Sequence, residues 1–449
     1  MASAAEQLAA NFNFGALSKA TELKKRIWFT LGALVIYRLG TYIPLPGIDS
    51  GVVAQIFNQQ AGGIIGMLDM FAGGALSRMS IFALNIMPYI SAAIIMQLMT
   101  AVSPHFAAMK KEGESGRKKI NQYTRYGTVL LATFQAYGLA VGMESMQGTQ
   151  GSGAVMNPGL FFRTTTVVTI VGGTIFLMWL GEQITQRGVG NGISLIIFAG
   201  IIAELPAAIA QTLDMGRTGA LPTIAIIAIL VLAVAVITFI VFIERAQRRI
   251  VVQYPKRQQG NKMFGGESSH LPLKLNTSGV IPPIFASSML LLPFSIISFS
   301  GGRGPEWLTT ASAMIGPGQP LFLVLFVTLI VFFAFFYTAI VFNPADTADN
   351  LKKYGGFIPG IRPGKNTADY LDFVLTRLTV AGAAYLAIVC ILPEILRAQN
   401  AAIPFYFGGT SLLIVVSVTM DTVAQIHSHL LAHQYEGLIK KSKLRGRRR

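Results

Sequence analysis

Ten apolar segments of bilayer length constrain the fold of this chain more than any other feature. They cover residues 27–43, 80–101, 123–143, 160–182, 190–212, 221–243, 277–299, 320–342, 378–397 and 405–425. A transmembrane helix needs about 20 consecutive, mainly apolar residues. Charged residues make up only 12% of the chain and are concentrated between these segments. The sequence therefore predicts an all-α polytopic membrane protein with ten transmembrane helices and no room for a separate soluble domain, which excludes most soluble enzyme classes.

The basic residues predict the orientation of these spans. The chain has 36 Lys+Arg against 20 Asp+Glu, a formal net charge of +16. Apart from Arg125, which lies at the start of the third span, the basic residues that fall outside the two tails and the even-numbered loops are Arg38, Arg78, Arg163, Arg217, Arg303 and Arg397. By the positive-inside rule, both termini lie in the cytoplasm. Residues 1–23 have no apolar core and Pro44 follows the first segment, so we interpret that segment as a retained span and not as a signal peptide.

Two basic loops, residues 244–276 and 343–377, are longer than span connectors need to be. Both mix basic runs with Gly and Pro turns, and long connecting segments often carry function. The surplus positive charge has two interpretations, which are attraction to anionic lipid and docking of a large acidic or RNA-containing partner. The length of the loops favours docking.

Two pairs of spans contain similar sequences. Residues 86–90 (IMPYI) of the second span align with residues 280–284 (VIPPI) of the seventh, and residues 192–197 (GISLII) of the fifth align with residues 409–414 (GTSLLI) of the tenth. Both pairs are separated by five spans, an odd number, so the matched spans run in opposite directions. Chance similarity between aliphatic segments is the alternative, but a shared offset argues against it.

The repeat predicts two inverted pseudo-symmetric halves around a central pore, spans 1–5 in residues 27–212 and spans 6–10 in residues 213–425. Residues 1–26 and 426–449 are then cytoplasmic tails. Any translocation path should lie between the halves, near the middle of the membrane. Pro88 and Pro282, at matched positions, are expected to remove a backbone hydrogen bond and disturb their helices, either beside a cavity or as plain kinks.

The repeated segments place aliphatic side chains on the expected path. These are Ile86, Ile90, Ile193, Ile197, Ile284 and Ile414. A solute transporter normally places ionisable or polar groups there, whereas an aliphatic ring makes a dewetting constriction that holds back ions without binding a substrate. Residues 61–78 are apolar and Gly-rich but too interrupted to span the membrane. We expect them either to re-enter from the outer side or to lie on the lipid surface.

No pattern for enzymatic chemistry is present in the sequence. There is no GxxxxGK[ST] loop, and residues 188–192 (GVGNG) lack the strand-turn-helix context of a dinucleotide site. Cys390 is the only cysteine, and we expect it to serve in packing. His427, His429 and His433 include an i, i+4 pair, but without carboxylate or Cys ligands we interpret them as a solvated helix end. The sequence predicts neither a cofactor nor a metal.

Several long motifs resemble the SecY/Sec61-alpha family of protein-conducting channels. They are GGALSRMSIFALNIMPYISAAIIMQL (73–98), KKEGESGRKKINQYTRYGT (110–128), FLMWLGEQITQRGVGNGIS (176–194), ERAQRRIVVQYPKRQQG (244–260), NPADTADNLKKYGGFIPGIRPG (343–364) and FYFGGTSLLIVV (405–416). They cover both halves of the chain. Asn85 and Pro283 depart from the family pattern, where many members carry Gly and Ala, and the tail histidines are not an expected family feature.

The resemblance implies roles for individual residues. The six isoleucines correspond to the pore ring. Residues 61–78 correspond to the plug that closes the ring, with Gly63, Ile64, Ile65, Met67, Phe71, Gly73 and Gly74. Spans two and seven correspond to the lateral gate, with Pro88, Pro282, Ser91, Gln97 and Asn276. The two basic loops correspond to the docking surface for the ribosome and the SecA ATPase, with Arg248, Arg249, Lys256, Arg257 and Arg362. The alternative for Ser91, Gln97 and Asn276 is a routine role in helix contacts or at span ends. The alternative for Arg257 is a position in a solvated turn without a docking role.

The resemblance also implies a location and partners. Family members of this kind reside in the bacterial inner membrane, with SecE and SecG as companion subunits and SecDF and YidC as further associates. Signal peptides and nascent chains are the substrates, and SecA or the ribosome supplies the driving force. Anionic lipid is expected around the basic face.

A secondary transporter for a small solute remains the alternative, because inverted repeats and broken helices are equally typical of that class. Intramembrane charge separates the two hypotheses. The best candidates for coupling residues are Glu204, close to Pro206, and Asp421, near one end of the tenth span. A carrier should lose its substrate dependence when either carboxylate is neutralised, whereas a channel should be little affected.

Overall fold

A computed structural model describes residues 20–60, 66, 69, 71–145, 153–219, 222–254, 257–259, 262–264, 268–299, 319–399 and 409–446. Each of the ten predicted spans overlaps one helix. The helices are α3 (Thr21–Gly40), α6 (Met87–Val102), α8 (Glu114–Ser145), α9 (Leu160–Arg187), α10 (Gly192–Arg217), α11 (Thr223–Arg245), α12 (Ile281–Phe299), α14 (Pro320–Val341), α16 (Lys365–Gln399) and α17 (Gly409–Gly446). Shorter helices are α4 (Ser50–Gln60), α7 (Pro104–Lys111) and α15 (Pro344–Lys353).

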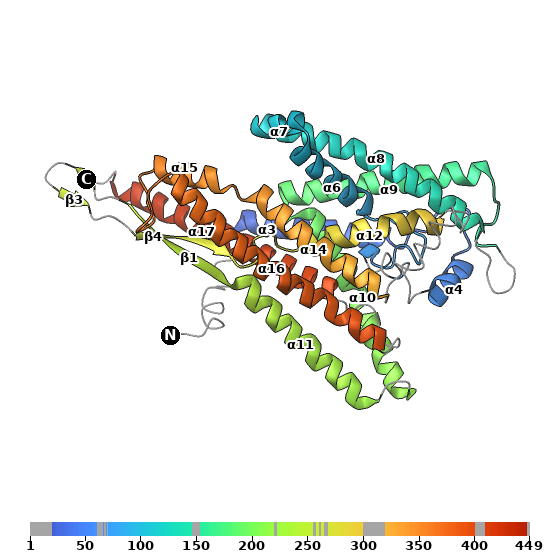
Figure 1. Ribbon diagram of the computed structural model, residues 1–449. Helices are drawn as coiled ribbons and strands as arrows, with labels where there is room; N and C mark the ends of the chain where they lie inside the picture. The colour runs from blue at the N-terminus through green and yellow to red at the C-terminus, as the bar shows by residue number, and fades with distance from the viewer. Residues whose placement is uncertain are drawn as a thin grey trace.

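The helical, membrane-spanning architecture predicted from the sequence is confirmed. Within the described residues, six helices are long and apolar enough to cross a membrane. Helices α6 and α7 form a further apolar pair, bent by 96° at the break between Val102 and Pro104. Figure 1 shows an elongated molecule in which α15, β1 and β4 lie at one end and α4 lies at the other.

The prediction for the two matched prolines is wrong. Helix α6 begins at Met87 and α12 begins at Ile281, so Pro88 and Pro282 both lie in a first helical turn. The backbone N–H of a first-turn residue has no intrahelical acceptor, so proline removes no helical hydrogen bond there. The irregular part of the second span lies before the proline, where residues 81–86 form turns. These prolines therefore start helices and do not kink them.

The internal repeat is visible in local structure. Its first pair of segments starts α6 and α12 one residue before the matched prolines, and its second pair starts α10 and α17 at Gly192 and Gly409. A Cβ at either of these glycines would collide with a backbone carbonyl of the preceding long helix, that of Gly181 or that of Val389. The matched helices also contact each other, α6 with α12 and α10 with α17. Equivalent residues thus have equivalent packing in the two halves.

The first basic loop contains strands that the sequence analysis did not predict. Strand β1 (Gln247–Gln253) pairs antiparallel with β4 (Ser268–Lys274), in a register that sets Gln247 opposite Lys274. At the tip, β2 (Arg257–Gln259) pairs with β3 (Lys262–Phe264). The alternation of buried Ile250 and Val252 with exposed neighbours is typical of a half-buried strand.

The two basic loops form one folded unit. Gln253 and Phe357 exchange two backbone hydrogen bonds, each 2.9 Å long. Beneath them a small apolar cluster combines side chains from β1, β4, the segment after α15 and the start of α16. Its buried members are Ile250, Leu273, Ile358, Leu371, Val374 and Leu378. The loops therefore present their basic residues from a common rigid base.

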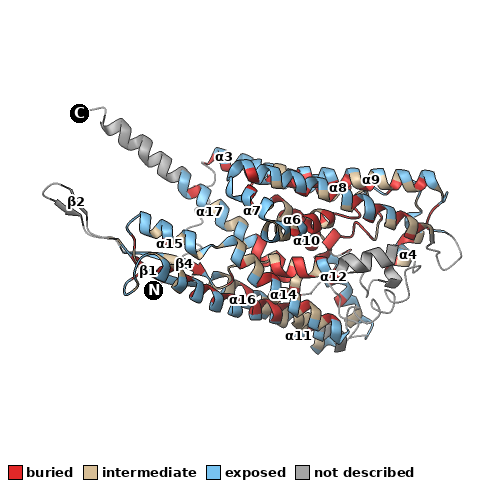
Figure 2. Cartoon of the chain, turned by 45° about the horizontal axis from the view of Figure 1, so that its top comes forward, coloured by how far each residue is buried: buried red, intermediate tan, exposed pale blue. Residues whose placement is uncertain are grey.

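The main apolar core lies where helices of both halves meet. Buried residues gather on α6 and α10 in Figure 2. Ile86, Ile196 and Ile201 are at most 1% exposed, and Leu413 of α17 and Ile330 of α14 are fully buried. In contrast, α11 contributes little to this core and exposes much of its apolar surface, as expected for a helix that faces lipid.

Candidate pore constriction and plug

A cavity of about 10 Å³ lies at the centre of this core, with room for about one water molecule. Its lining residues are Phe71, Asn85, Ile86, Met87, Ile90, Ile197, Ile284, Ser287 and Ser288. They come from the predicted plug segment, the turn before α6, and helices α6, α10 and α12. Four of the six predicted ring isoleucines thus meet around one narrow space.

The other two predicted ring residues do not line this cavity. Ile193 lies in the first turn of α10 and packs against α9, where its Cγ1 would be 3.1 Å from a Cβ placed on Gly181. Ile414 of α17 is 1% exposed and belongs to the main core. The cavity instead contains Met87, Ser287 and Ser288. The two serines could have been found from helix periodicity, since they lie three and four residues after Ile284.

The predicted plug segment is described at residues 66, 69 and 71–78, so Gly63, Ile64, Ile65 and Met67 lie outside the described residues. Asp69 organises the turn that follows. Its Oδ1 accepts hydrogen bonds from the backbone N–H groups of Leu76 at 3.0 Å and Ser77 at 2.9 Å. Asp69 is only 8% exposed, and these bonds offset part of the cost of burying its carboxylate.

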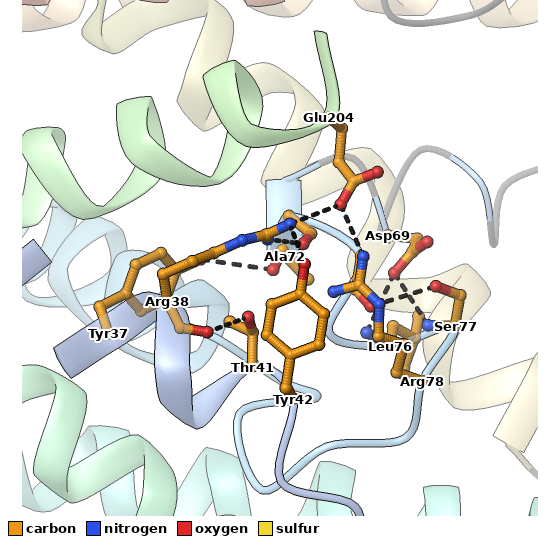
Figure 3. A network of polar contacts seen from close by, with 12 residues as sticks. Tyr37, Arg38, Thr41, Tyr42, Asp69, Ala72, Leu76, Ser77, Arg78 and Glu204 are labelled. Atoms are coloured by element: carbon orange, nitrogen blue, oxygen red, sulfur yellow. Dashed lines mark hydrogen bonds and ion pairs between the residues drawn. The ribbon is translucent and has the colours of Figure 1, made fainter. Parts of the chain in front are cut away.

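Three charged residues fasten this turn to two helices (Figure 3). Arg38 of α3 and Arg78 both donate to the same carboxylate oxygen, Glu204 Oε1 of α10, at 3.3 and 2.9 Å. The Tyr42 ring lies beside both guanidinium groups, with its centroid 5.0 Å from Arg38 Cζ and 4.5 Å from Arg78 Cζ. We refer to Arg38, Arg78 and Glu204 as the charge cluster. The Glu204 side chain is 11% exposed, whereas the Arg38 and Arg78 side chains are 25% and 33% exposed, so the carboxylate is shielded from water more than its partners.

Backbone contacts reinforce the charge cluster. Arg38 Nη1 donates to the carbonyl of Gly73 at 2.7 Å, and the Tyr37 hydroxyl donates to the carbonyl of Ala72 at 3.3 Å. Gly73 has φ +64° and lies against Gly200 of α10, where a Cβ would come within 2.7 Å of Gly200 Cα. A side chain at position 73 is therefore excluded both by backbone conformation and by space.

The predicted gate residues lie in two separate places. Ser91 of α6 is 7% exposed, and Gln97 near the other end of α6 has a buried Oε1 without a partner among the described residues. Asn276 precedes α12 and donates to Glu244 Oε1 of α11 at 2.7 Å and to the carbonyl of Gly279 at 3.0 Å. Asn276 therefore ties the start of α12 to the end of α11.

The predicted docking residues share one end of the molecule. Arg248 and Arg249 are exposed on β1, and Arg362 is exposed in the segment between α15 and α16. Arg257 belongs to β2, although its side chain is not described, and Lys256 lies outside the described residues. The backbone hydrogen bonds between Gln253 and Phe357 connect β1, which contains Arg248 and Arg249, to the segment that leads to Arg362.

The candidate coupling residues of a transporter do not form a substrate site. Glu204 is occupied by two arginines, and Asp421 is exposed on α17. Among the described residues, no group of three or more His, Cys, Asp and Glu side chains is arranged to hold a metal ion. Cys390 is 2% exposed in α16, as the packing role requires. His429 is exposed and His427 half-buried on the part of α17 that extends beyond its apolar portion.

Comparisons with known proteins give a family for the chain. A family model described as SecY matches residues 80–423. The chain is 58% identical over 426 residues to the protein translocase subunit SecY of Escherichia coli K12, covering 95% of this chain and 96% of the relative. It is 55% identical over 436 residues to the protein translocase subunit SecY of Vibrio cholerae, covering 96% and 97%.

Solved structures share the fold at low sequence identity. A protein-conducting channel matches with a TM-score of 0.66 at 18% identity, covering 91% of this chain and 92% of the other. A SecY structure concerned with how the plug domain stabilises the closed state of the translocation channel and maintains a membrane seal matches at 0.60 and 19%, with the same coverage. Sec61 in the canine ribosome-channel complex matches at 0.63 and 17%, again with the same coverage. Near-complete coverage at more than half identity, together with the family match, shows that this chain belongs to the SecY family.

Proposed function

We propose that this chain is the protein-conducting channel of a Sec translocase. It passes unfolded, signal-bearing polypeptides across the bacterial inner membrane and releases hydrophobic segments sideways into lipid. The observation that carries this proposal is the central cavity, where Ile90 of α6, Ile197 of α10 and Ile284 of α12 meet Phe71 of the predicted plug. Relatives named as protein translocase subunits support the same function.

The chemistry of the cavity suits a seal better than a binding site. Aliphatic side chains have no groups to hold an ion or a polar solute, and a narrow constriction lined by them favours the loss of water. Because such side chains contact a passing chain only through dispersion and hydrophobic forces, they accept many different sequences. The two serines at its edge are small, and the charged groups of the described plug residues, Asp69 and Arg78, are already engaged in hydrogen bonds and ion pairs.

We assign residues 61–78 as the plug that closes this constriction. Phe71 reaches the cavity, and the charge cluster and Gly73 hold the turn behind it against α3 and α10. All of these contacts are non-covalent and most are polar, so a chain that enters can displace them. The plug domain in a related SecY structure supports this assignment.

We assign α6 and α12 as the two sides of the lateral gate. They belong to different halves, residues 27–212 and 213–425, and they contact each other beside the cavity. Both begin at the repeated Pro motif, with the matched proline in the first helical turn. Asn276 fixes the turn at the start of α12 and so sets the pivot of that side.

We assign the folded unit of the two basic loops as the docking surface for SecA and the ribosome. Arg248, Arg249 and Arg362 reach solvent there, and a guanidinium can bind carboxylate or phosphate through two parallel hydrogen bonds. We also include Lys256 and Arg257 in the proposed docking function. Sec61 in a canine ribosome-channel complex has the same fold, which supports a ribosome as one partner.

The remaining assignments follow from the same function. SecE and SecG complete the channel complex, SecDF and YidC associate with it, and anionic lipid surrounds its basic face. ATP is hydrolysed by SecA and not by this chain. Both termini lie in the cytoplasm, on the side of the basic loops.

Reconstitution tests the function directly. The chain is inserted with SecE and SecG into vesicles, and SecA, ATP and a signal-bearing precursor are added on the side of the basic loops. We expect part of the precursor to become protected from added protease, with protection dependent on ATP and on the signal sequence. Vesicles with SecE and SecG alone provide the control. Protection at the control level in the complete system would refute the channel function.

A further inference from the structure

Asn85 has an unusual backbone conformation for a residue with a side chain. Its φ is +47°, and Met79 is the other non-glycine residue with positive φ among those described. Glycine adopts this left-handed region without strain, and asparagine tolerates it better than most residues. The turn before α6 thus requires a residue such as glycine or asparagine, but this requirement alone does not select asparagine.

The side chain of Asn85 makes a specific contact with the predicted plug. Its Nδ2 donates a hydrogen bond of 2.6 Å to the backbone carbonyl of Phe71, 14 residues earlier in the chain. Asn85 is 2% exposed, and its Oδ1 is buried without a partner among the described residues. Burying an amide with one unpaired oxygen costs free energy. Glycine would avoid this cost while keeping the backbone relaxed, so the polar contacts of the amide, with the Phe71 carbonyl and with the Tyr37 side chain, are what distinguish asparagine here.

The contact joins two functional elements. On one side, Phe71 is 6% exposed and lines the central cavity. On the other side, Asn85 lines the same cavity and lies directly before Ile86. Ile86 is the N-cap residue of α6, and the helix begins at Met87. A movement of α6 therefore carries Asn85 with it and changes the position of its amide relative to Phe71.

We propose that Asn85 is a positioning residue that holds the plug closed through the Phe71 carbonyl and releases it when α6 moves. This inference rests on the proposed function, because it takes residues 61–78 as the plug and α6 as one side of the gate. The charge cluster fastens the plug at residues 73–78. Asn85 fastens it at Phe71, next to the seal itself, where release is coupled to the gate helix.

Two variants separate the side chain of Asn85 from its backbone. Asn85→Gly removes the amide and keeps the left-handed turn relaxed, whereas Asn85→Ala removes the amide and strains the turn. Each is reconstituted in planar bilayers, and channel openings are counted without substrate. A second readout is the rate at which a membrane-impermeant thiol reagent modifies Ala72→Cys, because Ala72 lies within the proposed plug and is 2% exposed in the closed structure. The native Cys390 is equally buried and gives the background rate.

We expect Asn85→Gly to raise both the frequency of openings and the modification rate about fivefold, the effect of losing one neutral hydrogen bond. Its midpoint of thermal unfolding should stay close to that of the parent, whereas Asn85→Ala should lower the midpoint as well. Leak in Asn85→Ala alone would assign the effect to backbone strain and overturn the inference. Leak in Asn85→Gly with the introduced thiol at position 72 still protected would place the leak in the ring and also overturn it.

Ile90→Asn serves as the control that distinguishes this inference from the proposed function. If Ile90→Asn leaks and Asn85→Gly behaves like the parent, the role of Asn85 is refuted and the channel function stands. If neither variant leaks, the seal at the central cavity is refuted, and the role of Asn85 fails with it.

Discussion

Arg78 Nη2 lies 2.9 Å from Glu204 Oε1 and so joins the end of the predicted plug to the middle of α10, 126 residues away in sequence. This ion pair changes the role that Glu204 is expected to have. From sequence alone, Glu204 is a candidate coupling residue whose neutralisation a channel should tolerate. In the structure it holds two arginines beside the plug, so Asp421, which is exposed, is the better residue for separating a carrier from a channel.

Neutralising Glu204 should open the channel. Hydrogen bonds to charged groups contribute about 1.5–3 kcal/mol each, so Glu204→Gln should raise the frequency of channel openings roughly tenfold or more. Single-channel recording without substrate measures this. Glu144→Gln is the matched control, because Glu144 forms a comparable ion pair with Arg163 between α8 and α9 that does not touch the plug. Equal effects of the two variants would show that general destabilisation, and not plug release, is being measured.

Replacing Gly73 should displace the plug. Gly73→Ala introduces strain at φ +64° and places a Cβ within 2.7 Å of Gly200 Cα, so the plug turn cannot keep its contact with α10. We expect frequent openings and loss of a few kcal/mol of stability at this turn. Gly219→Ala is the control for conformation alone, because Gly219 has φ +77° and open space around it. If the two substitutions gave the same conductance, the close packing of Gly73 on Gly200 would have no role in closure.

The six predicted ring isoleucines should separate into two groups. Ile90→Asn and Ile284→Asn put an amide into the central cavity and should raise ion leak through the reconstituted channel. Ile193→Asn and Ile414→Asn should change thermal stability more than leak, because these side chains pack away from the cavity. Conductance and unfolding midpoints of the four variants check this. Unchanged conductance for Ile90→Asn and Ile284→Asn would contradict the constriction.

Reversing the charge at Arg362 should uncouple the motor. Arg362→Glu removes a guanidinium from the edge of the folded basic loops and adds a carboxylate. We expect SecA-driven export to fall roughly tenfold or more while insertion and unfolding temperature stay the same. The introduced carboxylate would repel the acidic groups of the motor that the guanidinium attracts. Arg217→Glu, an arginine at the end of α10, is the control. Export by Arg362→Glu at the parental rate would remove Arg362 from the docking surface.

Linking α6 to α12 should block export. Met87 and Ser287 both line the central cavity, one on each side of the proposed gate. Cysteines at these two positions, joined by a short thiol cross-linker, should stop protease protection of a signal-bearing precursor, and cleavage of a reducible linker should restore it. Either single cysteine treated with the same reagent is the control. Continued export with the pair fully joined would rule out separation of α6 and α12 during transport.

The spans were predictable because each is a local property of the sequence. A run of apolar residues such as 221–243 predicts a membrane helix without knowledge of its neighbours, and α11 follows it closely. The repeat of GISLII and GTSLLI predicted matched spans, and in the structure Gly192 and Gly409 pack alike against the preceding long helix. The prediction for Pro88 and Pro282 was wrong because proline starts a helix when it lies in the first turn and disrupts a helix when it lies in the interior. The sequence does not show where these two helices begin.

The charge cluster was not predictable from the sequence in the same way. Arg38, Arg78 and Glu204 lie in three different segments, and no periodicity relates them. The hairpin in the first basic loop had a local signal, the alternation around Ile250 and Val252, but this alternation is short and lies beside basic residues that are equally typical of a solvated loop. Asn85 had a signal in its departure from glycine, although its partner Phe71 became apparent only in three dimensions.

The proposed plug segment, residues 61–78, has a property that affects how voltage would act on the channel. Asp69 and Arg78 are the charged residues in positions 61–78, so the segment carries no net formal charge. When it departs, Arg38 and Glu204 remain paired with each other, and the site left behind is also neutral. The free energy of moving one uncompensated charge across the membrane changes by about 2.3 kcal/mol for each 100 mV of membrane potential. A neutral plug exchanges none to first order, so an energised membrane can drive substrate through the channel without pulling the closed channel open.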